Sequence, residues 1–378
     1  MKILFVIKTM HLAGGGAERL LVQIISGLAD RRHNVSLLTF DPPGTSDFYP
    51  VDEAVRRVWI GKGPRGHRPG SLSSVMSVAR LRKALLKLTP DVAVGFMHSA
   101  YFPLALARAA TGIPGVGSEH IVWSHYADKP LERLSLWASA LTLDAFTAVS
   151  EPARQTFPPQ LRRKMTAIAN AVAGADGRIA DVAGRVEKVL LSVGRLEPQK
   201  DHETLIRAFS AIAPRFPDWS LRILGEGRLR EQLKALTREL GVDQRVRLPG
   251  AVSDIDSEYL RAQLFAISSR YESFGLVTAE ALARGLPVVG FADCPGTNEL
   301  VINNETGLLV AGLDRVSALA NGLALLMGSA DERARMAAAA PASVSDFSVE
   351  RMVERWEQLL TRVVQRRPAA SEEKSVRS

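Results

Sequence analysis

The sequence has a single cysteine, Cys294, in 378 residues. One cysteine cannot form a disulfide within the chain, and such scarcity is typical of proteins of the reducing cytoplasm. Long apolar runs are also missing, since no stretch approaches the ~20 apolar residues that a membrane span requires. The apolar run in the N-terminal MKILFVIKTM is shorter than a signal-peptide h-region and is typical of a buried strand. These absences predict a cytoplasmic protein that is soluble or peripheral on a membrane.

The standard phosphate-loop patterns are missing as well. Gly14, Gly15 and Gly16 lie between an apolar run and an amphipathic run, where glycines let another group approach the backbone closely. G-x-G-x-x-G fails because Arg19 occupies the last position, and a Walker A motif fails because Ala17 and Glu18 follow the glycines. The triplet therefore predicts either a ligand-facing loop of another type or a tight strand–helix turn.

Negative charge is scarce in the first half of the chain. Residues 1–180 hold 22 Lys and Arg against 13 Asp and Glu, whereas the remaining residues hold 26 against 27. The whole chain has a net charge of +8. An excess confined to one half predicts that this half faces something anionic, such as nucleic acid, acidic lipid or a phosphorylated acceptor.

Short β-rich apolar runs alternate with helical patterns along most of the chain, for example a strand over 2–7, a helix over 17–31 and a strand over 34–40. This alternation predicts an α/β fold in which helices flank parallel sheets. The pattern stops over 171–187, where the residues are small and polar, and then restarts. We therefore expect two Rossmann-like lobes with the ligand site in the cleft between them. The predicted parts are an N-terminal lobe (1–170), a linker (171–187), a C-terminal lobe (188–346), a closing helix that packs back on the N-terminal lobe (347–366) and a disordered tail (367–378).

Two glutamates eight positions apart flank the segment ESFGLVTAE. Ser273 is expected to cap a helix that begins at Gly275 and ends at Arg284, before Gly285. Glu272 would then lie just before the helix and Glu280 two turns along it. Free N–H groups at the helix start favour an anion, and the carboxylates suit hydroxyls of a ribose or a hexose.

Two cations follow the predicted strand KVLLSVG. Arg195 and Lys200 lie in the loop between that strand and the next helix. Cations at the carboxyl end of a strand, close to a helix start, suit a diphosphate whose negative charge grows as it leaves. Either residue alone would more commonly be a solvated surface cation.

An ordered set of motifs resembles family 4 glycosyltransferases with the GT-B fold. The set comprises GGGAERLLVQIISGLADRRHNVSLLTF, SVGRLEPQKDHETLIRAF, ILGEGRLREQLKAL, VRLPG, ESFGLVTAEALARGLPVV and NELVINNETGLLV, and it spans most of the chain. GGAER, SEH and CPGTNELV are most similar to the bacterial branch that builds lipid-linked oligosaccharides and exopolysaccharides.

The resemblance implies a metal-independent, retaining transfer of a sugar from a nucleotide-diphosphate donor. It implies that Arg195 and Lys200 hold the diphosphate, that Glu280 binds the ribose and that Glu272 contacts the sugar. The backbone of Phe274, Gly275 and Leu276 would complete the donor site, and the base would lie near Pro249 and Val252. Gly15 and Gly16 match paired glycines that would face this site from the N-terminal lobe.

Two histidines follow predicted strands of the N-terminal lobe. His120 matches the family histidine that points toward the transferred sugar. His98 is expected either to contact the acceptor or to cap a helix. No metal site is predicted, because Asp254 and Asp256, which imitate a metal-binding D-x-D triplet, are explained as acidic caps of the following helix.

A basic segment supplies much of the positive excess of the first half. Lys62, Arg65 and Arg68 lie in a Gly/Pro loop, and Arg80 and Lys83 lie on the helix predicted over 74–88. We expect this surface to contact anionic lipid or a diphosphate-linked acceptor. Nucleic acid is not expected, because neither a binding motif nor interleaved aromatic residues accompany the charge.

These patterns together predict a cytoplasmic enzyme, peripheral on the inner face of the cell membrane, that needs no cofactor. It would move a hexose or N-acetylhexosamine from a UDP-sugar, or from a GDP-sugar, onto a polyprenyl-diphosphate-linked glycan or a related saccharide. Two alternatives remain at this stage. One is a sugar-nucleotide epimerase of similar two-lobed fold, and the other is a non-catalytic partner that binds nucleotide sugars.

Overall fold

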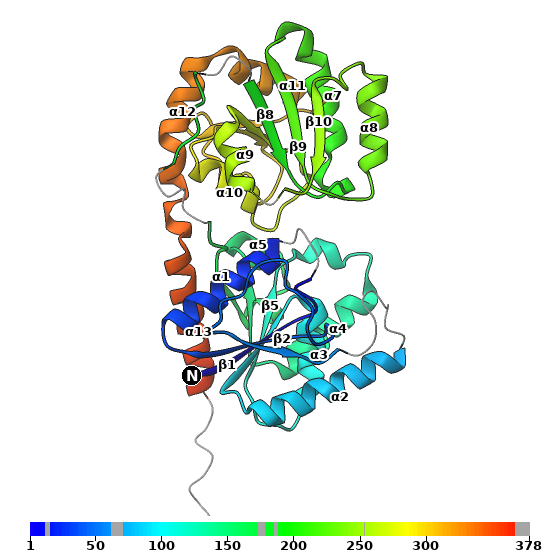
Figure 1. Ribbon diagram of the computed structural model, residues 1–378, viewed down its shortest axis with the longest axis vertical. Coiled ribbons are helices and arrows are strands. Elements are labelled where there is room, and N and C mark those ends of the chain that lie inside the picture. The colour runs from blue at the N-terminus through cyan, green and yellow to red at the C-terminus, as the bar shows by residue number, and fades with distance from the viewer. Residues whose placement is uncertain (12–15, 62–70, 173–177, 185–187, 253, 367–378) are drawn as a thin grey trace, which may run out of the picture. The chain divides into compact units, whose positions relative to one another are not determined.

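The chain folds into two compact units, shown in Figure 1. The computed structural model describes residues 1–11, 16–61, 71–172, 178–184, 188–252 and 254–366. Unit 1 consists of Met1–Asn170 with Val349–Ser378, and unit 2 consists of Ala171–Ser348.

Unit 1 is built on seven parallel strands in the order β3-β2-β1-β4-β5-β6-β7, with helices packed against them (Figure 1). The strands are β1 (Lys2–Ile7), β2 (Asn34–Thr39), β3 (Arg56–Trp59), β4 (Val92–Phe96), β5 (Gly115–Glu119), β6 (Ala145–Ala148) and β7 (Met165–Ala167). The α-helices are α1 (Gly16–Asp30), α2 (Ser71–Leu88), α3 (His98–Ala107), α4 (Pro130–Thr142), α5 (Glu151–Gln155), α6 (Pro159–Arg162) and α13 (Val349–Gln365).

Unit 2 repeats this plan with six parallel strands in the order β10-β9-β8-β11-β12-β13. The strands are β8 (Lys188–Val193), β9 (Trp219–Leu224), β10 (Val246–Gly250), β11 (Leu264–Ala266), β12 (Val288–Phe291) and β13 (Gly307–Val310). The α-helices are α7 (His202–Ile212), α8 (Arg230–Glu239), α9 (Ile255–Arg261), α10 (Leu276–Ala283), α11 (Arg315–Gly328) and α12 (Ala330–Ser343).

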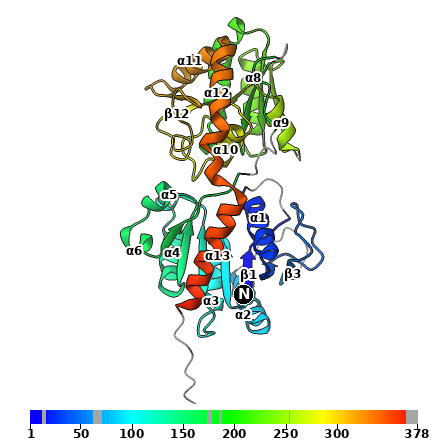
Figure 2. The same cartoon turned by 90° about the vertical axis from the view of Figure 1, so that its left-hand side faces the viewer.

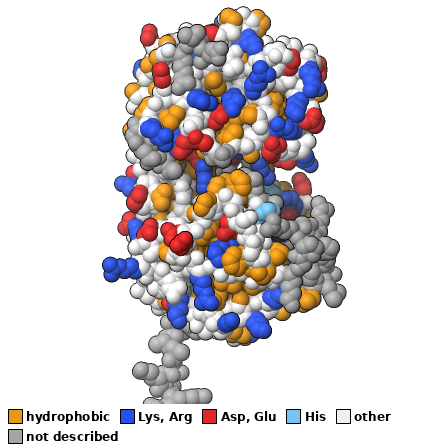
Figure 3. Space-filling model, viewed as in Figure 1, with side chains coloured by type: hydrophobic (Ala, Val, Ile, Leu, Met, Phe, Trp, Pro, Cys, Tyr) orange, Lys and Arg blue, Asp and Glu red, His pale blue; other side chains and the backbone are white. Residues whose placement is uncertain are grey.

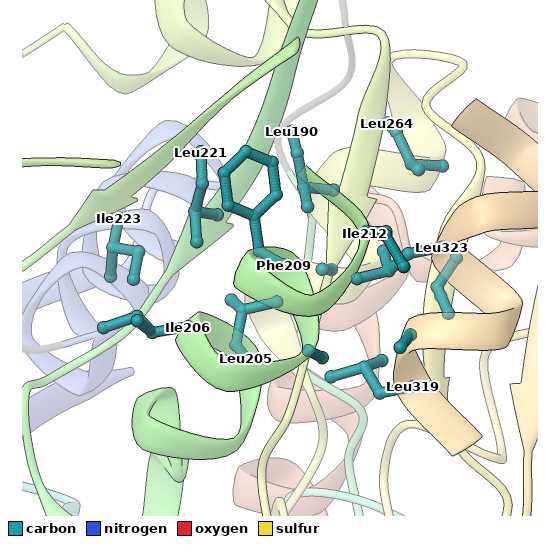
Figure 4. Close-up of a cluster of buried hydrophobic side chains, with 14 of the residues drawn as sticks. Leu190, Leu205, Ile206, Phe209, Ile212, Leu221, Ile223, Leu264, Leu319 and Leu323 are labelled. Carbon is teal, nitrogen blue, oxygen red and sulfur yellow. The ribbon is translucent and has the colours of Figure 1, made fainter. Parts of the chain in front are cut away.

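The core of unit 2 lies between its sheet and the amphipathic helices α7 and α11. Apolar residues of α7 recur at helical spacing and are buried against the strands and α11. Figure 4 shows this cluster, in which the labelled side chains are Leu190, Leu205, Ile206, Phe209, Ile212, Leu221, Ile223, Leu264, Leu319 and Leu323. Full burial of one such side chain stabilises a fold by about 1.5–3 kcal/mol, so this packing holds the strand ends of unit 2 in place.

Helix α13 belongs to unit 1, although it is the last helix of the chain. It packs along α1, as Figure 2 shows. Glu357 accepts a 2.7 Å hydrogen bond from Arg31 and lies 2.7 Å from the Nε2 atom of His33. Trp356 meets Phe5 of β1 edge to face at 6.0 Å between ring centroids.

The predicted α/β fold with two Rossmann-like units is confirmed, and most element ends agree within a few residues. The helix predicted over 74–88 begins at Ser71. Three strands were not predicted, namely β3, β7 and β13. Parts of the segment predicted as a linker pack on unit 2, where the N–H of Val172 donates to Phe347 O at 2.8 Å and Ala180 is buried. The predicted tail, 367–378, lies outside the described residues.

Candidate active site

The candidate donor site lies where the strand order of unit 2 reverses. Strands β8 and β11 are neighbours at the centre of the sheet, and the connections leave them toward opposite edges. Open α/β sheets bind ligands at this kind of switch point, outside the carboxyl ends of the strands. The loop after β8 carries Arg195 and Lys200, and the loop after β11 carries Glu272. The structure therefore brings the three predicted residues to one edge of the sheet.

Lys200 and Glu272 form an ion pair between these two loops. The Nζ atom of Lys200 lies 2.6 Å from Oε1 of Glu272, and the side chains are only 13% and 10% exposed. Ser269 donates a second hydrogen bond to the same carboxylate oxygen at 2.5 Å. Because both charges are largely removed from water, each depends on the other, and loss of one partner would leave an uncompensated charge.

Arg195 is the contrasting cation of the site. Its side chain is exposed, and across the described parts of the chain its guanidinium forms no hydrogen bond or ion pair. The backbone beside it is fixed, since Leu196 donates to Glu226 O and the Gly194 N–H donates to Leu224 O, both at 2.9 Å. Arg195 is thus an exposed cation on a hydrogen-bonded loop, which suits an incoming anion.

Close backbone packing shapes the start of α10. The predicted cap at Ser273 is wrong, because the residue before the helix is Gly275, with a φ of 85° and no side-chain cap. Gly275 and Gly296 both adopt left-handed conformations, and a Cβ on Gly296 would lie 2.8 Å from Glu272 O. Gly285 follows the helix with a φ of 71°, as expected for the glycine after a helix end. Phe274 is buried against Phe347 at 5.2 Å between ring centroids.

Glu280 is held inside unit 2 by a tyrosine. Its side chain is 4% exposed, and Tyr259 of α9 donates a 2.9 Å hydrogen bond to Oε2. The guanidinium of Arg284 lies over the Tyr259 ring at 5.4 Å and forms an ion pair with Asp256. Asp254 caps α9 by accepting from the Ser257 N–H at 3.1 Å, so the cap predicted for it is confirmed. Each carboxylate oxygen can accept more than one hydrogen bond, so a buried carboxylate oriented in this way is suited to accept from a ligand's hydroxyls.

The remaining residues predicted to contact the donor lie at or beside the elements in which they were expected, α10 and β10. Leu276 begins α10 and is partly buried. Pro249 is exposed in β10, and Val252 is partly buried just after it. Parallel strands end at the same edge of a sheet, so this loop shares the edge that carries Arg195.

In unit 1, His120 follows β5 and turns back toward the sheet. Its Nε2 atom lies 2.9 Å from Ser118 Oγ, and its ring lies 4.3 Å from that of Phe96. Burial lowers the pKa of His120 to about 3, so the imidazole is neutral at physiological pH. A neutral imidazole can donate one hydrogen bond and accept another.

Glu119, the neighbour of His120, is a buried carboxylate that the sequence did not single out. One oxygen accepts from the hydroxyls of Tyr101 and Tyr126 at 2.7 and 2.6 Å. The other accepts from the N–H groups of His120 and Ile121 at 2.9 and 3.0 Å. Burial raises the pKa of Glu119, and these hydrogen bonds partly oppose that shift. The four contacts fix the backbone from which the His120 ring projects.

His98 is the first residue of α3 and does not cap it. The residue before the helix is Met97, with a φ of 71° and no side-chain cap, so the capping alternative is wrong. His98 Nε2 instead lies 2.8 Å from Ser135 Oγ of α4. Burial lowers its pKa. Contact with an acceptor stays a prediction.

The other predicted residues of unit 1 are described only in part. Gly16 is the exposed first residue of α1, and Lys83 is exposed on α2. Arg80 is used inside unit 1, because its guanidinium donates to Ile60 O at 2.5 Å and to Met76 O at 3.2 Å. Four further predicted residues lie outside the described residues: Gly15, Lys62, Arg65 and Arg68.

Metal ligation and membrane spanning were both searched for in the described ranges. No group of three or more His, Cys, Asp or Glu residues there is placed to hold a metal ion. None of the helices in those ranges combines the length and apolar character that crossing a membrane requires. Independence from a metal stays a prediction.

Sequence reasoning missed a set of residues that support the donor loops. Arg315 donates to Ser269 O at 3.3 Å, forms an ion pair with Asp293 at 2.9 Å and lies 3.5 Å above the Phe291 ring. Asp201 pairs with Arg270 at 2.9 Å. These partners are far apart in sequence, so no local spacing of residues predicts the contacts.

Two family models match consecutive parts of the chain. Residues 14–173 match the family described as "Glycosyltransferase Family 4", and residues 182–343 match "Glycosyl transferases group 1". The chain is 26% identical over 355 residues to an uncharacterized glycosyltransferase of Haemophilus influenzae, a match that covers 92% of this chain and 97% of the relative.

Two further similarities extend over the whole chain. The chain is 25% identical over 365 residues, 96% of its length and 99% of the relative's, to a Campylobacter jejuni protein. That protein is named GalNAc-alpha-(1->4)-GalNAc-alpha-(1->3)-diNAcBac-PP-undecaprenol alpha-1,4-N-acetyl-D-galactosaminyltransferase. The crystal structure of Anabaena HepE in complex with UDP and glucose is similar with a TM-score of 0.79 at 22% identity, over 96% of this chain and 99% of that one. At this identity the similarity shows that the two chains share a fold.

Proposed function

Because the chain belongs to the family 4 glycosyltransferases and has the GT-B fold, we propose a specific reaction for it. It transfers a hexose or N-acetylhexosamine from a UDP-sugar to a polyprenyl-diphosphate-linked glycan or a related saccharide, with retention of configuration and without a metal. The observation that carries this proposal is the convergence of Arg195, Lys200 and Glu272 at the switch point of unit 2.

The proposed roles follow from the charge and burial of each group. Arg195, which is exposed, captures the diphosphate, and Lys200 stabilises the charge that develops as the diphosphate leaves. Glu272 holds Lys200 in place and accepts hydrogen bonds from the sugar. Glu280 binds the ribose hydroxyls from its buried position. For His120, Gly15 and Gly16 we propose contact with the donor, as the resemblance to the family implies.

The choice of donor and acceptor rests on the relatives. HepE is described in complex with UDP and glucose, and the Campylobacter relative is named for an undecaprenol-linked glycan. The chain's own contribution is the donor site just described and the positive excess of residues 1–180.

The experiment that tests the proposal has two stages. Thermal shifts are measured with a panel of UDP- and GDP-sugars, and the best donor is then incubated with polyprenyl-diphosphate-linked glycans. We expect a UDP-sugar to give the largest shift and the product to keep the anomeric configuration of the donor, read by NMR. No shift with any nucleotide sugar would overturn the proposal. Isomerised sugar formed without an acceptor would indicate an epimerase, and binding without transfer to any acceptor would indicate a non-catalytic partner.

We further propose that unit 1 binds the surface of an anionic membrane, where a lipid-linked acceptor would lie. Helix α4 exposes Leu131, Leu134 and Leu141 by 81%, 66% and 85%, and their spacing places them along one side of the helix. Arg133 is exposed on the same helix, and Figure 3 shows hydrophobic and basic side chains next to each other on unit 1. Apolar residues flanked by cations suit the boundary of anionic headgroups and acyl chains.

Vesicle flotation tests this surface. Wild-type protein should float with vesicles that contain phosphatidylglycerol and remain in solution with phosphatidylcholine alone. Replacing the three leucines by serine should abolish flotation, whereas serine at Leu313 and Leu325, which are exposed in unit 2, should not. Equal flotation of the two variants would contradict the assignment to α4.

A further inference from the structure

Three polar side chains form a hydrogen-bonded chain that ends at His120. Ser118 of β5 and Thr147 of β6 are directly paired in the parallel register, so their side chains lie on the same face of the sheet. Thr147 Oγ1 donates to Ser118 Oγ at 2.9 Å, and Ser118 Oγ lies 2.9 Å from Nε2 of His120. Both hydroxyl residues are buried, at 1% and 3% exposure.

The local backbone explains why these groups meet. Side chains along a strand alternate between faces, so His120, two positions after Ser118, returns to the face that Ser118 occupies. Phe96 of β4 is paired with Ser118 from the other side and supplies the ring against which the imidazole packs. Glu119 points to the opposite face, where Tyr101 and Tyr126 hold it. The imidazole is therefore held on one side by the Phe96 ring, and its backbone N–H is held by Glu119.

With Thr147 as the donor to Ser118, counting protons along this chain assigns the state of the imidazole. A hydroxyl has one proton, and Thr147 uses its proton toward Ser118. Ser118 Oγ then accepts one hydrogen bond and has its own proton left to donate to Nε2 of His120. A ring nitrogen that accepts a hydrogen bond has no proton, so the proton of the neutral imidazole must lie on Nδ1.

We propose that Thr147 and Ser118 are positioning residues that hold His120 as the neutral Nδ1–H tautomer, which makes it a hydrogen-bond donor at the site. Within the described residues the ring forms its hydrogen bond through Nε2 and none through Nδ1, and the residue is only partly buried. Burial, which lowers the pKa of this histidine to about 3, keeps the ring uncharged.

The tautomer determines which chemistry His120 can perform. An Nδ1–H group directed at a ligand donates to an oxygen of a hydroxyl or phosphate and cannot remove a proton from it. The tautomer of the ring in the free protein does not depend on the proposed function. The role of His120 toward the donor sugar does rest on the proposed function. His120 would then orient the donor and leave deprotonation of the acceptor to another group.

Nitrogen-15 NMR of the histidine rings in the free protein tests the tautomer directly. Comparison with His120→Gln assigns the signals among the seven histidines. At pH 7 we expect a protonated Nδ1 and an unprotonated Nε2. Thr147→Val removes the donor to Ser118, so Ser118 can accept from Nε2–H and the second tautomer should appear. Thr147→Ser keeps a hydroxyl and should retain the wild-type spectrum.

The possible outcomes separate clearly. An Nε2–H tautomer or a doubly protonated ring in the wild-type protein would overturn the proposal, and so would identical spectra for Thr147→Val and wild type. A folded Thr147→Val should also lower kcat by about threefold to tenfold, the effect of one misdirected hydrogen bond, and Thr147→Ser should not. If Thr147→Val changes the spectrum but not kcat, the assignment of the tautomer stands and only the role of His120 toward the donor is refuted. A protein that binds no nucleotide sugar at all would refute the proposed function and leave the spectra unaffected.

Discussion

Lys200 Nζ lies 2.6 Å from Glu272 Oε1, although 72 residues separate the two in sequence. Each residue follows a different strand, and those strands, β8 and β11, are neighbours at the point where the strand order reverses. The ion pair therefore results from topology and not from local spacing. Glu272 offsets the charge of Lys200 in the free protein. Under the proposed function, a bound diphosphate would share this cation with Glu272, while Arg195 would supply a second charge.

Replacing Lys200 by alanine should reduce kcat by orders of magnitude, because the cation that stabilises the leaving diphosphate is lost. It should also lower the free energy of unfolding by about 2 kcal/mol, since Glu272 is left largely buried without its partner. Urea denaturation and steady-state kinetics measure the two effects separately.

The double variant Lys200→Ala/Glu272→Gln distinguishes these effects. Removing the orphaned charge should restore most of the stability, while turnover stays low. Lys234→Ala, at the exposed pair with Glu231, serves as the control and should change stability by less than about 0.5 kcal/mol. Full turnover of the single variant would exclude Lys200 from the chemistry.

Replacing Arg195 by alanine should affect activity alone. Its side chain is exposed and has no partner in the described chain, so the melting temperature should not change. We expect kcat to fall by about 10²–10³, as for the loss of one preorganised donor to a developing anion. Arg228→Ala is the matched control, because Arg228 is also exposed near this loop and pairs at 2.9 Å with Glu197. A similar loss of kcat in both variants would show that general surface charge, not Arg195, is responsible.

The sequence predicted the α/β fold, the two units and the edge of the sheet that carries the donor residues, because each of these depends on periodicity or on position relative to a strand. It did not predict the cap of α10. Ser273 fits the statistical preference for a capping side chain, but Gly275 takes the position before the helix, in a left-handed conformation in which a Cβ would lie 3.0 Å from Gly296 O.

Contacts that depend on tertiary packing were also missed. Tyr259 meets Glu280 across 21 positions, and the four hydrogen bonds to Glu119 come from three different segments. Arg80, which was predicted to face an anion, donates to the carbonyl of Ile60 just after β3, a contact that the sequence did not predict. A pattern of residue types indicates which groups are available, and packing decides which partner each of them takes.

Replacing Tyr259 by phenylalanine should weaken binding of UDP through Glu280. The hydroxyl donates to Oε2 at 2.9 Å, and the variant removes this hydrogen bond from the buried carboxylate. We expect Kd for UDP to rise about threefold to tenfold and the preference for UDP over its 2′-deoxyribose analogue to decrease. Glu280→Ala should abolish that preference.

Calorimetric titration measures both ligands, and Tyr49→Phe in unit 1 is the control. A wild-type protein without this preference would refute the role of Glu280, whereas an unchanged preference in Tyr259→Phe would refute only that of Tyr259.

The stability of unit 2 should decrease as the pH falls below neutral, because of His202. This first residue of α7 is 4% exposed, and burial together with the charge of Lys200 lowers its pKa from 6.5 to about 4. Between those two values the unfolded chain binds a proton that the folded chain does not, so acidification favours unfolding, by up to about 3 kcal/mol over the window. His202→Gln should show a shallower loss of stability between pH 6.5 and 4, whatever its stability at pH 7. Parallel curves for wild type and His202→Gln would show that His202 is not the group that titrates.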